Sequence, residues 1–259
     1  MATTTFLSIV CLSIIQGITE WLPISSSGLL VIFEEIVLLE NKNTNLLFNI
    51  ATHTGSLVAV IIYFKKEILN IINNMPLIQN IIIATVPVIL IGALIKFFNI
   101  NIFLQNIKIV AYATIFFSIV LYLCDKSPVQ KKFSKNISNK NAFYIGLAQV
   151  LALIPGTSRS GITISCARYL GFSRFDSAKF SFLISIPTLF AATVFGIGEI
   201  VLNFDENILV ILFTGFLLSL VTSLLCIKIF LTFVEKNSLT IFVIFRLVLG
   251  FVLLFYLAN

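Results

Sequence analysis

Charged residues are scarce in this sequence: they make up 11% of its 259 residues, whereas 59% are hydrophobic. A soluble globular domain carries about 25% charged residues, so this shortage excludes an ordinary soluble fold. Apolar runs of roughly 20 residues, the length needed to cross a bilayer, recur along the chain. We therefore predict a single membrane domain over residues 1–259, with no sizeable soluble part.

Three further features are missing. The four cysteines, Cys11, Cys124, Cys166 and Cys226, form no CxxC pair and lie in or beside apolar segments, so we interpret them as packing residues. The N-terminus lacks the positive flank and cleavage site of a signal peptide, and we expect it in the mature protein. Basic residues account for the net charge of +6 but are not interleaved with exposed aromatics, so no nucleic-acid partner is expected.

Apolar stretches of spanning length occur six times and predict transmembrane helices at about residues 46–64, 79–98, 103–123, 178–201, 207–231 and 239–258. Two other segments, 6–39 and 142–172, are interrupted by proline, glycine and hydroxyl residues at 23–28 and 155–161. Non-helical backbone is tolerated at membrane depth only where protein or a water-filled cavity surrounds it. Each broken segment is therefore predicted to be a re-entrant helical hairpin, and the fold class is an all-α polytopic membrane protein.

The two broken segments resemble copies of one unit. A shift of 133 positions aligns Gln16 with Gln149, Ser25 with Ser158, Ser27 with Ser160, and Gly28 with Gly161. Each half, residues 5–123 and 142–258, is then a hairpin followed by three spans, and the basic loop 124–141 joins them. Because three spans make an odd number of crossings, the second half enters from the opposite face. This inverted repeat places the two interrupted helices face to face near the midplane.

Loop charges predict the orientation. One side carries nine basic residues: Lys65, Lys66, Lys126, Lys131, Lys132, Lys135, Lys140, Arg174 and Lys236. The other side carries only Lys42, alongside Glu40, Asp205 and Glu206. We therefore place the basic side in the cytoplasm, with both termini and the mouth of the first hairpin facing outward.

The first motif whose residues could carry out chemistry is QGITEWLPISSSGLL, residues 16–30. Gln16 and Glu20 are four residues apart, which puts both side chains on one face of a helix that points at the hairpin tip. An ionised glutamate inside a membrane costs at least about 2.5 kcal/mol, so it indicates a functional site. A glutamate at the aqueous end of a short helix is the structural alternative. Three serines, Ser25, Ser26 and Ser27, then offer capping oxygens to the returning half-helix.

The second motif is PGTSRSG, residues 155–161. Its proline and glycine break the helix, and its hydroxyl residues are predicted to restart it around Arg159. Helix N-termini present unpaired N–H groups and the positive end of a dipole, so two half-helices that meet tip to tip form an anion cradle. Arg159 adds a planar fork that suits phosphate, although an internally paired or snorkelling arginine is the alternative.

Two more polar residues inside apolar segments are candidates. His53 is the only histidine and lies about two turns inside a span, where it is a base, a hydrogen-bond donor or a structural residue. Arg246, seven residues into the last span, either reaches the site or snorkels to the cytoplasmic surface.

Together the motifs resemble those of the undecaprenyl-diphosphate phosphatase, or bacitracin-resistance, family: an acidic or amide residue, three residues and a glutamate leading into LPxSSSGH, and a PGxSRSG loop. The likeness extends through FNIATHTGSLVAVIIYF (48–64), FSRFDSAKFSFLISIPT (172–188) and RLVLG in the last span. It implies removal of the terminal phosphate from undecaprenyl diphosphate, a membrane lipid. It also implies that Glu20, Ser26 and Arg159 are catalytic, and that Gln16 occupies the first acidic or amide position.

The remaining residues of the two motifs are expected to bind substrate with His53: Gln16, Ser25, Ser27, Gly28, Thr157, Ser158 and Ser160. Glu20 is expected to act as a base or as a ligand to Mg²⁺ or Ca²⁺. One departure from the family is Leu29, which stands where the family often has a histidine after SSSG. Either His53 or Glu20 takes over proton transfer, or a water positioned by Glu20 and a divalent cation attacks, or this copy is slow. The nucleophile is Ser26 or water.

Other functions are compatible with parts of this pattern. Secondary transporters are also built from inverted repeats with broken helices, so a carrier or flippase of an anionic phosphate lipid is the main alternative. A carrier needs the arginine and the helix dipoles but not a carboxylate beside a serine, which favours the enzyme. A third possible function is that of a lipid-binding relative without catalytic activity, which only Leu29 and Gln16 support. A second copy of the chain is retained as a candidate partner.

Overall fold

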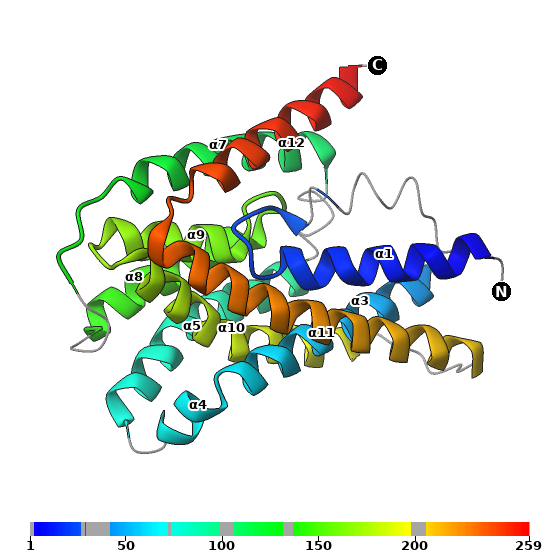
Figure 1. Cartoon of the computed structure of the whole chain (residues 1–259), viewed down its shortest axis with the longest axis horizontal. Coiled ribbons are helices and arrows are strands. Elements are labelled where there is room, and N and C mark those ends of the chain that lie inside the picture. The colour runs from blue at the N-terminus through cyan, green and yellow to red at the C-terminus, as the bar shows by residue number, and fades with distance from the viewer. Residues whose placement is uncertain are drawn as a thin grey trace.

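Helices are the only regular elements in the part of the chain that the computed structural model describes, residues 3–26, 29, 42–71, 74–98, 106–131, 137–197 and 206–258 (Figure 1). Five of them are long and apolar enough to cross a membrane: α3 (Lys42–Tyr63), α5 (Met75–Phe97), α7 (Ile107–Asp125), α10 (Arg174–Ile197) and α11 (Glu206–Lys236). They coincide with five of the six predicted spans. The prediction of an all-α polytopic membrane protein is confirmed.

The sixth predicted span corresponds to α12 (Thr240–Ala258), which is apolar but shorter. A short helix, α4 (Lys65–Ile71), follows α3 directly. The count of six spans therefore stays a prediction.

Both broken segments are interrupted where proline, glycine and hydroxyl residues occur. The first consists of α1 (Thr3–Thr19) and a non-helical stretch at 20–25, and the second of α8 (Asn139–Val150), η2 (Leu151–Leu153) and α9 (Arg159–Tyr169). The restart of the helix at Arg159 is confirmed. The returning half of the first segment lies outside the described residues apart from Ser26 and Leu29, so its re-entrant course stays a prediction.

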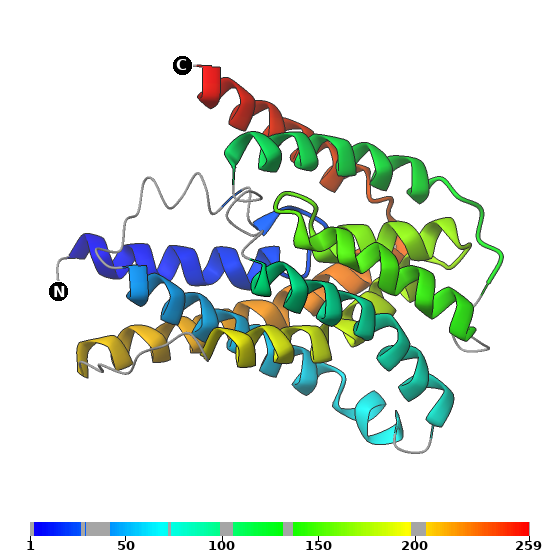
Figure 2. The ribbon, with the colours of Figure 1, turned by 180° about the vertical axis from the view of Figure 1, so that it is seen from behind.

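The helices form groups around the two interruptions (Figures 1 and 2). Helix α11 packs between α1 and α3, α5 packs on α8, and α7 packs on α12. The start of α1 and the end of α12 lie at one end of the molecule, whereas the end of α7, the start of α8 and the α11–α12 connection lie toward the other (Figure 1). Between these ends, the two interruptions meet in the middle of the bundle (Figure 1).

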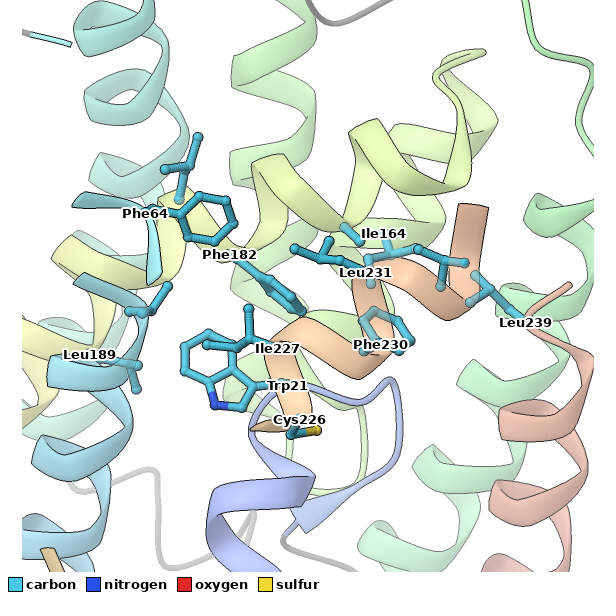
Figure 3. Packing of buried hydrophobic residues seen from close by; sticks show 14 of the residues in the cluster. Trp21, Phe64, Ile164, Phe182, Leu189, Cys226, Ile227, Phe230, Leu231 and Leu239 are labelled. Carbon is cyan, nitrogen blue, oxygen red and sulfur yellow. The ribbon is translucent and has the colours of Figure 1, made fainter. Parts of the chain in front are cut away.

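An aromatic cluster supports the first interruption from inside the bundle. Trp21 is completely buried, and its ring meets that of Phe182 edge to face at 5.0 Å between centroids. Ile227 and Phe230 of α11 lie beside them (Figure 3). Apolar packing thus fixes the backbone on either side of Trp21, including the preceding Glu20.

Small residues bring α1, α3 and α11 into close contact. A Cβ added to Gly55 of α3 would lie 2.4 Å from the carbonyl oxygen of Phe216 in α11. Next to it, Ser56 Oγ lies 3.0 Å from Ser219 Oγ and 3.0 Å from Ser223 Oγ, and all three serines are buried. In lipid, such close backbone approach and interhelical hydrogen bonds replace the hydrophobic effect as the forces that join helices.

We expect Gly55→Ala to lower the melting temperature of the detergent-solubilised protein, because overpacking a close contact costs about 1–3 kcal/mol. Gly92→Ala is the control: a Cβ there would meet only Leu153 Cδ2, at 3.6 Å. Equal melting temperatures for the two variants would contradict the close approach of α3 and α11.

A buried ion-pair cluster fixes the C-terminal end of α9. Arg174 donates two hydrogen bonds to Asp125, from Nε to Oδ1 (2.6 Å) and from Nη2 to Oδ2 (3.0 Å). Arg168 of α9 donates from Nη2 to the carbonyl oxygens of Asp125 (2.8 Å) and Ser127 (2.5 Å). The backbone N–H of Leu239, just before α12, also donates to Asp125 (3.1 Å). Helices α7, α9, α10 and α12 are therefore joined at this end.

Candidate active site

The two interruptions line one cavity of about 360 Å³. Its polar wall consists of Thr19, Glu20, Ser26, His53, Gly156, Ser158, Arg159, Ser160 and Thr188. Its apolar wall consists of Ile24, Val88, Ala152, Leu153, Ile154, Pro155, Leu189 and Ala192. The cavity is thus lined by charged and by apolar residues, which suits a ligand with an anionic head and an apolar body.

Glu20 is the central group of the polar wall. Its side chain is 8% exposed, and Arg159 Nη2 donates to its Oε1 atom at 2.6 Å. The other carboxylate oxygen, Oε2, accepts from Gln16 Nε2 at 3.0 Å and lies 3.3 Å from His53 Nδ1. An opposite charge and two polar groups thus surround the carboxylate, which compensates it for the loss of water.

Arg159 is held on three sides. Besides its bond to Glu20, its Nη1 atom donates to the carbonyl oxygen of Ser181 in α10 (3.3 Å). The guanidinium carbon lies 5.7 Å from the centroid of the Trp21 ring, within the range of a cation–π contact. The guanidinium is therefore pre-oriented at the wall of the cavity.

His53 and Gln16 share one hydrogen-bond network with Glu20. The Gln16 Nε2 atom lies 3.1 Å from His53 Nδ1, and the same ring nitrogen lies 3.3 Å from Glu20 Oε2. A neutral imidazole nitrogen either accepts from the amide or donates to the carboxylate, but does not do both. The network thus has two proton arrangements, and the His53 side chain, 36% exposed, is accessible from the cavity.

The second interruption ends in a strained residue. Ser158 has φ 66° and ψ 114°, a region that residues other than glycine rarely adopt, and its side chain caps α9 by accepting from the N–H of Gly161 (3.2 Å). Ser160 Oγ donates to the carbonyl oxygen of Leu22 in the first interruption (2.8 Å). The tips of the two segments are therefore joined directly.

The sequence-predicted residues separate into three groups. Glu20, Ser26, His53, Ser158, Arg159 and Ser160 line the cavity. Gln16, Ser25 and Thr157 are buried and do not line it, although Gln16 reaches it through Glu20 and His53. Ser27 and Gly28 lie outside the described residues.

The structure also shows where Leu29 and Arg246 lie, two residues whose positions the sequence did not determine. Leu29 packs on an apolar cluster of α7 and α12 that includes Val110 and Leu249, and it does not line the cavity. Arg246 has no exposed surface, so the snorkelling interpretation is wrong.

The sequence led us to expect apolar walls for the isoprenoid chain, but it identified neither Trp21 nor the individual residues of the apolar wall. Trp21 could have been found, because it is the only tryptophan and directly follows Glu20. The residues from α5, η2 and α10 carry no such signal, because apolar side chains occur throughout these segments. Two prolines inside helices, Pro87 and Pro187, directly precede the cavity-lining Val88 and Thr188.

A divalent cation fits the site only in part. The described residues contain no group of three His, Cys, Asp or Glu side chains able to hold a metal. Two carboxylate oxygens offer about four acceptor positions. Arg159, Gln16 and His53 approach three of the positions on Glu20. Mg²⁺ is commonly held by one or two carboxylates plus substrate phosphates, so the free position on Glu20 suits a cation whose other ligands come from the substrate and water.

The fold and cavity define a class: a polytopic helical membrane protein in which two interrupted segments bring a buried carboxylate and a guanidinium to one cavity. The family model for the bacitracin resistance protein BacA matches residues 9–252. Among curated proteins, an undecaprenyl-diphosphatase of Pelagibacter ubique is 42% identical over 98% of both chains. Those of Aliivibrio salmonicida (37%, over 95% of this chain and 96% of the relative) and Campylobacter curvus (40%, over 95% and 97%) are similar over nearly their whole lengths. The chain belongs to the bacitracin resistance protein BacA family.

Proposed function

We propose that this protein hydrolyses undecaprenyl diphosphate to undecaprenyl phosphate and inorganic phosphate, which recycles a lipid carrier for cell-wall synthesis. The observation that carries the proposal is one cavity lined by the Glu20–Arg159 pair, by Ser26 and by apolar residues. The names of the relatives support the same substrate. A transporter of an anionic lipid would need the Arg159 guanidinium but not a carboxylate and a serine at the same site. The enzyme is therefore favoured over the transporter.

Arg159 and the start of α9 bind the diphosphate. Phosphoryl transfer needs positioning and charge stabilisation more than covalent chemistry from the protein. The guanidinium is pre-oriented by Ser181 and Trp21, so it can pass from Glu20 to phosphate oxygens with little loss of side-chain entropy. The apolar wall receives the first part of the isoprenoid chain, which enters from the membrane.

Glu20 and His53 handle the proton. The nucleophile, Ser26 Oγ or a water molecule, attacks the terminal phosphorus, and the bond from that phosphorus to the bridging oxygen breaks. Undecaprenyl phosphate leaves with the bridging oxygen, and the proton of the nucleophile passes to Glu20 or His53. With Ser26 as nucleophile, water then hydrolyses the phosphoserine and releases inorganic phosphate. A bound Mg²⁺ or Ca²⁺, held by Glu20 and the substrate, would neutralise negative charge on the phosphates.

We also propose that residues 5–123 and 142–258 form an inverted repeat. The cavity then opens to the outer face of the bacterial plasma membrane. Two helix pairs support the repeat: α1 packs on α11, and α8 packs on α5, as exchange of the two halves requires. The position of both termini at one end supports a common face for them (Figure 1). A homodimer stays a prediction from the sequence.

The proposal is tested by phosphate release from undecaprenyl and farnesyl diphosphate by the purified protein, with Mg²⁺, with Ca²⁺ and with a chelator. We expect release that exceeds that of the Glu20→Ala variant. No release with either cation would refute the enzyme, and equal release with and without the chelator would refute the cation. Labelling of Lys131 from outside intact cells would refute the orientation.

We expect His53→Ala to lower kcat about 10- to 100-fold, because one proton-handling group is lost while Glu20 remains. Leu29→His should not raise kcat, since the new imidazole would lie in an apolar cluster away from the cavity. Steady-state phosphate release measures both effects. A gain of activity in Leu29→His would show that position 29 faces the substrate.

A further inference from the structure

Arg246 of α12 is a fully buried cation whose strong partners are backbone oxygens. Its Nη2 atom donates to the carbonyl oxygens of Thr157 (2.9 Å) and Gly156 (3.1 Å), and more weakly to that of Thr114 (3.4 Å). Among the described residues, its Nε and Nη1 atoms have no hydrogen-bond partner and no acidic side chain pairs with it. A buried charge of this kind is costly in a membrane protein and marks a functional region.

The contact with the Thr157 carbonyl determines where the next N–H points. A peptide unit is planar, and in its trans form the C=O and the following N–H point in opposite directions. Because the Thr157 carbonyl faces Arg246, the N–H of Ser158 faces away from Arg246. Ser158 lines the cavity and Arg246 does not. From these two placements we infer that this N–H is turned to the cavity side. The positive φ of Ser158 is the strain that accompanies this turn.

Three successive N–H groups where the loop meets α9 have no acceptor among the residues that the structure describes. The N–H of Gly161 is capped by Ser158 Oγ, and that of Ile162 donates to the Ser158 carbonyl. These three groups are the N–H groups of Ser158, Arg159 and Ser160, for which no bond to a described residue occurs. Successive free N–H groups at a helix start form an anion-binding concavity.

Arg246 also packs directly on the first turn of α9. A Cβ added to Gly161 would lie 2.8 Å from Arg246 Nη1, so a side chain at that position would displace the guanidinium. The arginine therefore supports the loop from the side that faces away from the cavity.

We propose that Arg246 is a positioning residue: it holds the carbonyls of residues 156 and 157 back, so that the N–H groups of Ser158, Arg159 and Ser160 face the terminal phosphates of the substrate. The inference rests on the proposed function, since it concerns the same site. Arg246 does not touch the phosphates, and its effect passes through the peptide units of the loop.

The test compares wild type, Arg246→Lys and Arg246→Met by KM for farnesyl diphosphate and by the inhibition constant of inorganic pyrophosphate. We expect both constants to rise more than 10-fold in Arg246→Met and less in Arg246→Lys, whose ammonium can keep one carbonyl contact. A merely structural role would lower thermal stability and the active fraction but leave both constants unchanged, and that result would overturn the proposal.

Arg168→Lys is the matched control, because Arg168 is a buried arginine that also binds backbone carbonyls, at the other end of α9. It should lower the melting temperature and leave KM within about 2-fold of wild type. If Arg246→Met does not fold, Gly161→Ala takes its place in the test, because the added Cβ would displace the Arg246 guanidinium. An unchanged KM for farnesyl diphosphate in Gly161→Ala would overturn the proposal.

Binding of pyrophosphate can also be followed without turnover, through the fluorescence of Trp21, the only tryptophan. If wild type binds pyrophosphate and releases no phosphate from the lipid, the proposed function fails. Weaker pyrophosphate binding in Arg246→Met would then still support the inference. If wild type is active but its affinity for pyrophosphate equals that of Arg246→Met, the inference alone fails.

Discussion

Arg159→Met is expected to lower kcat/KM for farnesyl diphosphate about 10³-fold or more. Removal of one preorganised donor from a site of developing negative charge costs about 10²- to 10³-fold, and an arginine at a transferring phosphoryl group contributes about 10³- to 10⁵-fold. Arg159→Lys should recover little, because an ammonium cannot reproduce the bonds to Glu20 and the Ser181 carbonyl with one planar fork. Phosphate release under steady-state conditions measures both variants.

Loss of stability must be separated from loss of chemistry in Arg159→Met. Removing one partner of a buried ion pair leaves Glu20 uncompensated and costs about 3–5 kcal/mol. The double variant Glu20→Gln/Arg159→Met has no buried charge at this pair, so it should regain most of the melting temperature but none of the activity. A double variant with restored activity would contradict the role of Arg159 at the phosphates.

The chain offers a second ion pair as a control for Arg159. Lys179 Nζ lies 3.0 Å from Glu67 Oε1, with the two side chains 24% and 36% exposed. Exposed pairs contribute about 0–1 kcal/mol, and neither residue lines the cavity. Lys179→Met should therefore keep activity within about 2-fold of wild type. Equal losses in Lys179→Met and Arg159→Met would indicate a general effect of removing a cation from the bundle.

The sequence predicted the helices well because the length of an apolar run is a direct consequence of bilayer thickness. It predicted the breaks because proline and glycine cannot continue a helix without cost. The restart at Arg159 follows from the same local chemistry, and Ser158 supplies the cap. Local rules therefore account for the two interruptions and for the presence of Glu20 and Arg159 at them.

The sequence did not predict which face of each helix points inward. In a membrane both the lipid and the interior accept apolar side chains, so the usual amphipathic pattern is weak. Helix α5 shows this: it exposes Ile82 and Leu90 but buries Ala84 and Thr85. Size and polarity distinguish the buried face here better than hydrophobicity.

Contacts between segments far apart in the chain could not be predicted from the sequence either. His53 lies next to Glu20 because Gly55 and its serine neighbours hold α3 against α11, which in turn packs on α1. Arg246 points into the bundle because it donates hydrogen bonds there to the carbonyl oxygens of Gly156 and Thr157. Both placements depend on the packing of several helices, which no single motif encodes.

Glu20→Gln is expected to lower kcat at least 10³-fold while retaining the fold. The amide has nearly the shape of the carboxylate but no charge and little basicity, so it cannot accept the proton of the nucleophile and would offer a cation only a neutral oxygen. Glu20→Asp should be nearly as slow, because the shorter side chain cannot reach Arg159, Gln16 and His53 together. Single-turnover phosphate release distinguishes slow chemistry from slow product release.

The matched control for Glu20→Gln is Glu67→Gln, which removes the carboxylate of the exposed ion pair with Lys179. It makes the same chemical change in the same chain and should leave kcat within about 2-fold of wild type. The combination Glu20→Gln/His53→Ala tests whether the two groups act together: if they handle one proton, the double variant should be little slower than Glu20→Gln alone. Multiplied losses would instead mean that His53 acts independently, through substrate contacts. Activity within 10-fold of wild type in Glu20→Gln would remove the carboxylate from the mechanism and leave Arg159 and the α9 start as the whole phosphate site.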